Sequence, residues 1–195
     1  MNKLLISVFL LVGQFIFNSC HIPHDREIIC EMNFKKARDL AYKNPTDTSK
    51  LDSALSIVNK SMQCDSIKLA VVDLKIALLI TLGKYDDGTR FIDSLQKSDF
   101  TYPYKKNLIH DNFIALTYAA KGDTVSRDRV YIKIANDLEK YIEAGKLKSK
   151  EFKEAFTELN GLQSKFMDTA ALHRKIDSLI VKYPEEERFL DFFKQ

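Results

Sequence analysis

An all-α fold is what the sequence predicts, and three observations carry the prediction. The 195 residues include only six Gly and four Pro, too few for the many tight turns of a β-rich protein. Apolar residues recur three and four positions apart from about residue 26 onward, the spacing of one face of an α-helix. Charged residues make up 29% of the chain and are interspersed, as on the solvated faces of such helices. We therefore expect about eight helices and a short capping helix at the C-terminal end.

The N-terminal residues Met1–Ser19 have the features of a secretion signal. Lys3 supplies one positive charge, the apolar stretch Leu4–Phe17 follows, and the small residue Ser19 stands before a cleavage position. The apolar stretch is shorter than the roughly 20 residues that a membrane-spanning helix needs. We therefore expect this segment to be removed as a signal peptide, which makes Cys20 the first mature residue.

The residues Phe17-Asn18-Ser19-Cys20 resemble a lipobox, the recognition site of bacterial lipoprotein maturation. The resemblance implies that the Cys20 thiol is joined to diacylglycerol and that acyl chains such as palmitate anchor the protein in the bacterial cell envelope, on the periplasmic or surface face of the outer membrane. Several acyl chains anchor a protein stably, whereas a single chain binds marginally. The alternatives are an uncleaved apolar helix or an ordinary signal peptide near an unmodified cysteine. With lipidation, residues 20–25 form a tether and residues 26–195 form the helical domain.

Two segments repeat the same pattern about 34 residues apart. In Leu51–Ser61 and again in Tyr85–Leu95, a large apolar residue is followed three positions later by a small one, Ala54 or Gly88. This period and the stretch Leu82–Gly88 resemble the tetratricopeptide repeat, a helix–turn–helix unit. The resemblance implies a right-handed solenoid of antiparallel helix hairpins (TPR-like), with a concave groove that binds peptides. The chain departs from the family pattern because it has no Trp and carries Gly88 where Ala is expected.

The first hairpin is expected from two helices on either side of Pro45. Residues 26–43 end there because proline disfavours the helical conformation at the residue before it. Residues 49–63 begin at Ser49, which forms an N-terminal capping pattern with Asp52 three positions later. The apolar stripe of the first helix consists of Phe34, Ala37, Leu40 and Ala41.

Glycines mark the ends of the next helices. Residues 66–82 are almost uniformly apolar and should form the most buried helix, which Gly83 ends by adopting the left-handed conformation. Residues 85–98 are expected to form the partner of this helix. Residues 104–120 form the following helix, and Gly122 supplies the break after it.

Three more helices are expected in the remaining sequence. Residues 124–144 form a long helix that Gly145 ends, and residues 149–166 form the next. Residues 169–182 form the last of the three, with Asp168 or Thr169 as its cap. The inward-facing residues expected for the long helix are Val130, Ile134, Leu138 and Tyr141.

The segment Glu185–Gln195 is rich in Phe and can form one last short helix. Its first turn would be the acidic run Glu185–Glu187, which the helix dipole favours. Stacked repeats need end caps, because each hairpin buries its apolar face only against a neighbour. The alternative role is an exposed aromatic hook for a partner. The residues expected to be buried are Phe189, Leu190, and Phe192 or Phe193.

Cys30 and Cys64 lie at equal distances in sequence from Asp47, the centre of the turn expected between the first two helices. An antiparallel hairpin therefore places them side by side at its open end. Exported proteins occupy compartments where disulfides persist, and neighbouring helices can bring two Cα atoms within the required range of about 4.4–6.8 Å. Two outcomes stay open, a disulfide or two buried free thiols that pack as small apolar groups.

The sequence contains none of the common catalytic signatures, neither a zinc-protease helix motif, a nucleophile elbow nor a glycine-rich phosphate loop. We therefore expect a non-enzymatic protein without a cofactor or a metal. His21 and His24 lack a third ligand and are interpreted as part of the tether, and His110 and His173 as surface or boundary residues. The basic residues interpreted as a solvated loop and helix start are Lys146, Lys148, Lys150 and Lys153.

If the repeat resemblance holds, the first helix of each pair lines the peptide-binding groove. The candidate groove residues on this chain are Lys36, Asp39, Lys43, Asp73, Thr81 and Asn112, each of which could instead be ordinary helix surface. The expected function is a membrane-anchored scaffold that binds a protein or peptide partner. The alternative is an accessory lipoprotein that captures glycan for an outer-membrane uptake system. A net charge of only +3 gives no electrostatic case for nucleic-acid binding.

Overall fold

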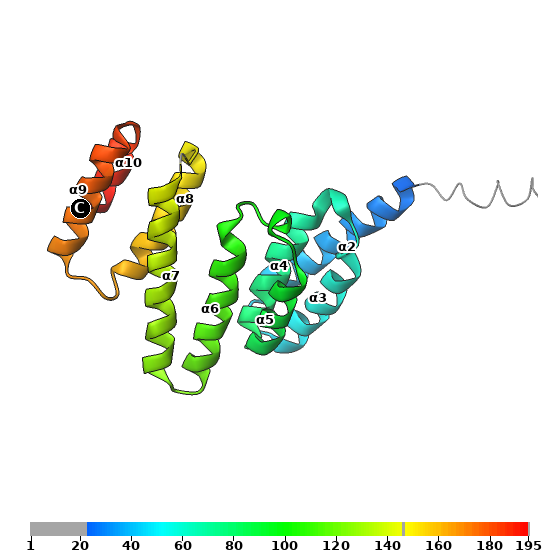
Figure 1. Ribbon diagram of the computed structural model, residues 1–195. Helices are drawn as coiled ribbons and strands as arrows, with labels where there is room; N and C mark the ends of the chain where they lie inside the picture. Colours follow the sequence, from blue (N-terminus) through cyan, green and yellow to red (C-terminus); the bar gives the residue numbers. More distant parts are fainter. Residues whose placement is uncertain (1–22, 146, 195) are drawn as a thin grey trace, which may run out of the picture. The chain divides into compact units, whose positions relative to one another are not determined.

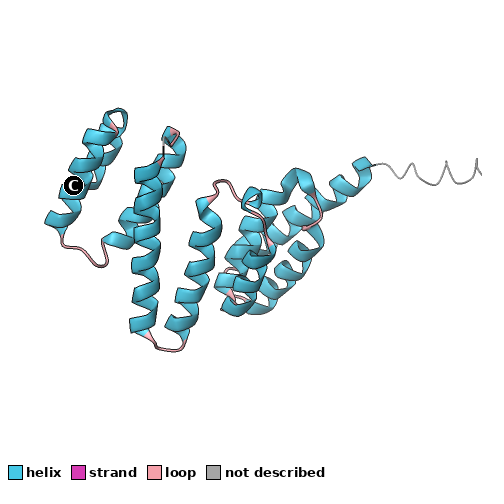
Figure 2. Ribbon diagram, in the orientation of Figure 1, coloured by secondary structure: helices cyan, strands magenta, loops and turns pink. Residues whose placement is uncertain are grey.

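The computed structural model describes residues 23–145 and 147–194, and within them the all-α prediction is confirmed. These residues form nine α-helices, labelled α2–α10, four short 3-10 turns, η1–η4, and no strand (Figure 2). The described residues divide into two compact units, with the boundary between Leu78 and Leu79. The expected signal peptide, Cys20 and His21 lie outside the described residues. No helix in the described ranges is both long and apolar enough to cross a bilayer.

The first unit contains a hairpin of α2 (Pro23–Lys43) and α3 (Thr48–Ser61), which pack against each other. Both helices bury small or branched residues, such as Ala37 in α2 and Val58 in α3. The N-cap of α3 is Asp47, whose carboxylate accepts a hydrogen bond of 3.1 Å from the Lys50 backbone N–H. The predicted Ser49 cap is therefore wrong, because α3 begins earlier and the aspartate already satisfies a free N–H group of its first turn.

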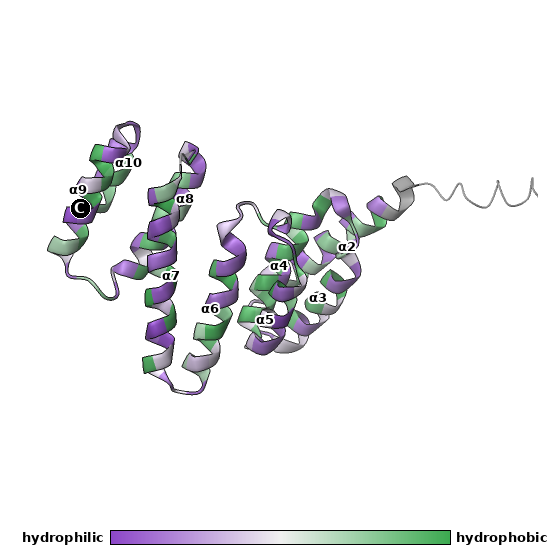
Figure 3. Cartoon of the chain, in the orientation of Figure 1, coloured by the Kyte–Doolittle hydropathy of each residue, from purple (hydrophilic) through white to green (hydrophobic). Residues whose placement is uncertain are grey.

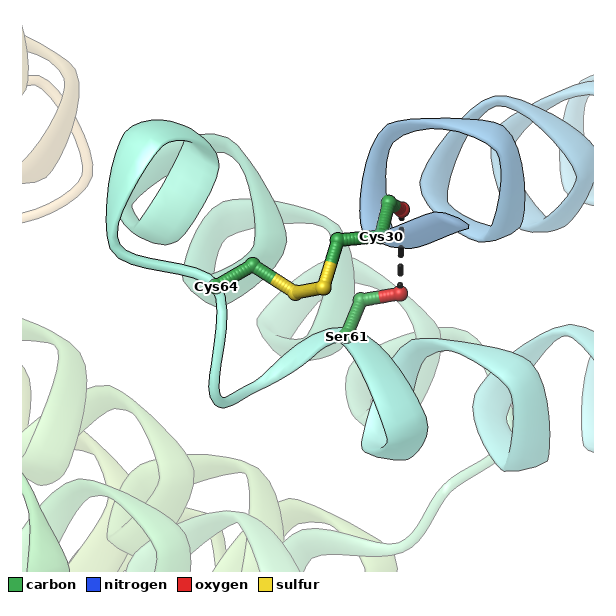
Figure 4. Close-up of a disulfide and its surroundings, with 3 residues drawn as sticks. All are labelled: Cys30, Ser61 and Cys64. Carbon is green, nitrogen blue, oxygen red and sulfur yellow. Dashed lines mark hydrogen bonds between the residues drawn. A yellow bond between two sulfur atoms is a disulfide. The ribbon is translucent and has the colours of Figure 1, made fainter. Parts of the chain in front are cut away.

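A disulfide between Cys30 and Cys64 closes the open end of this hairpin (Figure 4). The two Cα atoms are 6.1 Å apart, inside the range that a disulfide requires. Both cysteines are buried, and the Ser61 hydroxyl beside them donates a hydrogen bond of 3.5 Å to the Cys30 carbonyl. The sequence left open a disulfide or two buried free thiols, and the structure contains the disulfide.

The helix α4 (Lys68–Thr81) follows the turn η1 (Asp65–Ile67) and is the most apolar helix described (Figure 3). Val71 and Val72 are fully buried, but Leu69 on the same helix is 45% exposed. The burial of α4 is therefore one-sided, although its composition is apolar on nearly every side. Gly83 follows the helix with a φ of 67°, so the predicted left-handed C-terminal residue is confirmed.

The second unit consists of helices that pack against their neighbours in sequence. Contacts join α5 to α6, α6 to α7 and α7 to α8, and Figure 1 shows α6 and α7 side by side. The α-helices are α5 (Tyr85–Ser94), α6 (Tyr104–Ala120), α7 (Thr124–Ala144), α8 (Ser149–Gln163), α9 (Thr169–Lys182) and α10 (Glu187–Asp191). The short turns are η2 (Lys97–Asp99), η3 (Pro184–Glu186) and η4 (Phe192–Lys194).

The predicted ranges of α6 and α7 are confirmed, whereas α5 and α8 end earlier than predicted. Helix α6 stops before Gly122, which has a φ of 75°, and Asp123 then caps α7 by accepting a hydrogen bond of 2.9 Å from the Ser126 N–H. Helix α5 ends at Ser94 because the chain turns into η2, where the Gln96 N–H donates to the Asp99 carboxylate. Asp168 is the cap of α9 and accepts a hydrogen bond of 2.7 Å from the Ala171 N–H.

The C-terminal segment packs on the core of the second unit. Leu190 is fully buried, and the rings of Phe189 and Phe193 lie 5.8 and 5.1 Å from the ring of Phe156 in α8. Phe192 is 67% exposed, whereas Phe193 is partly buried, so of these two alternatives Phe193 is the one that packs on the core. The acidic run does not form a single helical turn, because Glu185 and Glu186 belong to η3 and only Glu187 belongs to α10.

Gly88 lies at the contact between α5 and α6, where the repeat family would have Ala. A Cβ atom added there would overlap the ring of Phe113, which is fully buried in α6. The two helices therefore approach closely because Gly88 has no side chain.

We expect Gly88→Ala to lower the free energy of unfolding by about 1–3 kcal/mol, because the added methyl group overpacks against Phe113. Chemical denaturation monitored by circular dichroism measures the change. The matched control is Gly161→Ala in α8, where an added Cβ meets no atom within 4 Å. That substitution should stabilise the protein by about 0.5–1 kcal/mol through helix propensity. An equal effect of both substitutions would contradict the packing explanation.

We expect removal of the disulfide by Cys30→Ala and Cys64→Ala to lower the free energy of unfolding by about 3–4 kcal/mol in the chain-entropy model. The loop that the bridge closes has a sequence separation of 34 residues. Urea denaturation with and without a thiol reductant measures the difference. The double variant should be insensitive to reductant. Alkylation of both thiols in the unreduced wild-type chain would contradict the bridge.

Candidate functional site

One face of α2 forms a shallow depression of about 560 Å³, which we call the α2 surface. The α2 surface is lined by Met32, Lys35, Lys36, Asp39, Leu40, Lys43 and Asn44. Three of the six predicted groove residues, Lys36, Asp39 and Lys43, are therefore together. They share this face because residues three, four and seven positions apart lie on one side of an α-helix.

The α2 surface is positively charged and partly apolar. Three lysines line it against the single carboxylate of Asp39, which also has the Arg38 guanidinium 3.9 Å away. Met32 is 66% exposed and supplies an apolar contact area on the same face. An extended segment with acidic residues and one apolar side chain complements these properties.

The other three predicted groove residues do not line the α2 surface. Asp73 and Thr81 are exposed residues of α4, and Asn112 is a half-buried residue of α6. Asp73 belongs to the first unit, whereas Thr81 and Asn112 belong to the second. Only the three candidates on α2 are therefore gathered in one depression, and their role as a groove stays a prediction.

A second hollow, the α6–α7 pocket, lies within the second unit and has a volume of about 370 Å³. Its lining comes from η2 and from the facing sides of α6 and α7. The lining residues are Lys97, Pro103, Tyr104, Asn107, Leu108, Asp111, Ile134, Asp137, Leu138 and Tyr141. The pocket combines an apolar wall with charged and amide groups, the composition typical of small-molecule sites.

Two tyrosines of the pocket wall are held in place by groups on α8. The Tyr141 hydroxyl donates a hydrogen bond of 2.5 Å to the Glu151 carboxylate, and its ring lies 4.9 Å from the ring of Tyr104. Burial and then the bond to Glu151 raise the pKa of Tyr141 to about 12. Burial, followed by the charges of Glu158 and Glu154, also raises the pKa of Tyr104. Both phenols therefore stay protonated near neutral pH, and because the Tyr104 hydroxyl is buried and the Tyr141 hydroxyl is bonded to Glu151, it is the rings that line the pocket.

The carboxylates on α8 are partly neutralised by one lysine. Lys105 of α6 lies 2.8 Å from Glu154 and 3.9 Å from Glu158. Burial is the largest cause of the raised pKa of Glu158, and the nearby Lys105 ammonium acts in the opposite direction. These ion pairs join α6 to α8 behind the tyrosines, so their main effect is to position the pocket wall.

The four lysines interpreted as a basic loop and helix start, residues 146–153, differ in their surroundings. Lys146 lies outside the described residues, and Lys148 and Lys150 are exposed as expected. Lys153 is an exception, because its ammonium lies 3.2 Å from the buried carboxylate of Glu186 and 5.6 Å from the centre of the Phe189 ring. The Lys153 side chain is still 44% exposed, so it is a solvated residue that also pairs with the C-terminal segment.

The histidines offer little to a metal in the part of the chain that the structure describes. His110 is half-buried between Asp93 at 3.4 Å and Asp111 at 3.2 Å, and His173 is half-buried on α9. Across residues 23–145 and 147–194, no group of three His, Cys, Asp or Glu side chains could hold a metal ion.

Sequence reasoning missed most of the α6–α7 pocket for a structural reason. Its residues come from three elements, and no single periodic pattern contains them all. Tyr104 is the first residue of its helix, where no helical periodicity precedes it. Tyr141 was predicted only to face inward. For the α2 surface a signal was present, because Met32 and Leu40 lie at helical spacing from the predicted Lys36.

The comparisons with protein-family models, with curated proteins and with solved structures found no match.

Proposed function

We propose that the chain is a bacterial envelope lipoprotein, anchored through Cys20, whose helical body is a non-enzymatic scaffold for a protein partner. The lipobox resemblance of residues 17–20 supports the anchor. The 34-residue pattern and the packing of helices that are consecutive in sequence support a right-handed solenoid of TPR-like hairpins. The partner docks through an acidic peptide segment.

The observation that carries this proposal is the gathering of Lys36, Asp39 and Lys43 on the α2 surface. The repeat resemblance implied groove residues on the first helix of a pair, and α2 is the first helix of the disulfide-closed hairpin. The excess of lysines on this face favours an acidic partner and steers its approach. The exposed Met32 adds the apolar contact that charge alone does not provide.

We expect photo-crosslinking from position 32 in intact cells to capture a protein partner, because Met32 is exposed on the α2 surface. A crosslinker at Val181, which is 84% exposed on α9, is the positional control. Lys36→Glu with Lys43→Glu should reduce the adduct about tenfold through charge repulsion. Lys148→Glu with Lys150→Glu makes the same charge change at exposed positions on and beside the start of α8 and should have no effect. An adduct that both charge reversals leave unchanged would count against the acidic-peptide proposal.

We expect Cys20→Ala to move the chain from the membrane fraction to the soluble fraction, because the variant has no thiol to acylate. Mass spectrometry of the N-terminal peptide measures the acyl mass on the wild-type protein. The control is Cys30→Ala with Cys64→Ala, which should stay with the membrane. Membrane retention of Cys20→Ala, or an N-terminal peptide without acyl mass, would contradict the anchor.

A further inference from the structure

The α6–α7 pocket has the size of a site for a small molecule. Its volume of about 370 Å³ lies near the lower end of the roughly 300–1,000 Å³ found for small-ligand pockets. The pocket lies wholly in the second unit and shares no residue with the α2 surface. Its chemistry can therefore be considered separately from the protein-docking face.

The wall of the pocket suits one apolar side chain of a ligand. Leu108, Ile134 and Leu138 line it beside the rings of Tyr104 and Tyr141. Ile134 and Leu138 are 3% and 2% exposed, so they are core residues that form the apolar floor of the pocket. The hydrogen bond from the Tyr141 hydroxyl to the Glu151 carboxylate restrains the orientation of the Tyr141 ring.

Two residues that line the pocket offer hydrogen-bond donors to a negative group. Lys97 is an exposed residue of η2, and its ammonium makes no ion pair with any residue that the structure describes. Asn107, one turn into α6, likewise has a side-chain amide without a hydrogen-bond partner among the described residues. An ammonium and an amide that line one pocket are suitable donors for a carboxylate.

Two other residues that line the pocket, Asp111 and Asp137, are acidic. Asp111 of α6 and Asp137 of α7 both contact the single ammonium of Lys133, which lies 3.2 Å from Asp137. His110 also contacts Asp111, at 3.2 Å. Two carboxylates thus share one lysine, so one carboxylate charge is not matched by a lysine. An ammonium group of a ligand would compensate this charge.

We propose that the α6–α7 pocket binds a small zwitterion with an apolar side chain, a free amino acid or a dipeptide. The carboxylate of the ligand pairs with Lys97 and Asn107, and its ammonium pairs with Asp111 and Asp137. The side chain packs on the tyrosines and the apolar floor. A neutral sugar would leave both charged parts of the pocket lining without a partner, which is why the zwitterion is favoured over glycan.

Isothermal titration calorimetry on the full chain in detergent at pH 6.5, where the amino groups of all the ligands are protonated, tests the proposal. The ligands are L-leucine, L-phenylalanine and L-methionine, each titrated to about 10 mM, with the dipeptide Leu-Leu in a separate titration. At least one amino acid or the dipeptide should bind in the millimolar range or tighter, about −4 kcal/mol or better. A tighter complex with Leu-Leu identifies peptides as the source of the ligand, and a tighter complex with an amino acid identifies free amino acids. No binding by any member overturns the proposal.

Two blocked analogues test whether both charges matter. N-acetyl-L-leucine lacks the ammonium group and L-leucinamide lacks the carboxylate, so each should bind about tenfold more weakly than L-leucine. Equal binding of either analogue, or stronger binding of glucose, overturns the assignment to a zwitterion.

Single substitutions test which pocket residue pairs with which charged group of the ligand. Lys97→Met should weaken L-leucine binding about tenfold and leave L-leucinamide unchanged, because only the carboxylate contact is lost. Asp137→Asn should weaken L-leucine and L-leucinamide and leave N-acetyl-L-leucine unchanged. The control Lys150→Met, at an exposed position on α8 outside the pocket, should change none of them. Unchanged circular dichroism spectra separate these effects from misfolding, and a Lys97→Met variant with wild-type affinity for leucine overturns the proposed pairing.

Discussion

Helix α7 is packed on two sides, and the architecture of the second unit depends on this packing. It contacts α6 along one side and α8 along another, and it buries Ile134, Leu138 and Ile142. At its C-terminal end, the phenol of Tyr183 donates hydrogen bonds to the carbonyls of Ile142 and Gly145, which holds the end of α9 against it. Because densely packed interiors transmit displacement, a shift of α7 would change both the α6–α7 pocket and the seat of the C-terminal segment.

The helices that the sequence located well are those with strong local signals at both ends. The bounds of α6 and α7 agree with prediction because Gly122 requires the left-handed conformation and Asp123 caps the next helix, and both effects act within one turn. The bounds of α5 and α3 were less accurate. At the start of α3 two polar residues are candidates for the same cap, and the sequence alone does not show that Asp47 prevails over Ser49. At the end of α5 the chain turns into η2, where Asp99 accepts from the Gln96 N–H.

The sites were predictable to very different extents. Lys36, Asp39 and Lys43 are on one face of one helix, so periodicity was sufficient to group them. The α6–α7 pocket exists because η2 meets α6 and α7, a tertiary arrangement that single-helix patterns do not contain. Gly88 is intermediate, since its departure from the repeat pattern was visible in the sequence, but its cause, the Phe113 ring, was not.

The disulfide also changes how the protein carries mechanical load. Tension that enters the chain on the N-terminal side of Cys30 passes through the covalent bond directly to Cys64. The intervening residues, which include the whole α2 surface between Met32 and Asn44, are therefore outside the path of the force. After reduction of the disulfide, the same tension would act on these residues. If they unfolded, the 34-residue separation would add about 110–120 Å of extended chain. Tension applied at the N-terminal end would thus leave the α2 surface folded for as long as the disulfide is intact.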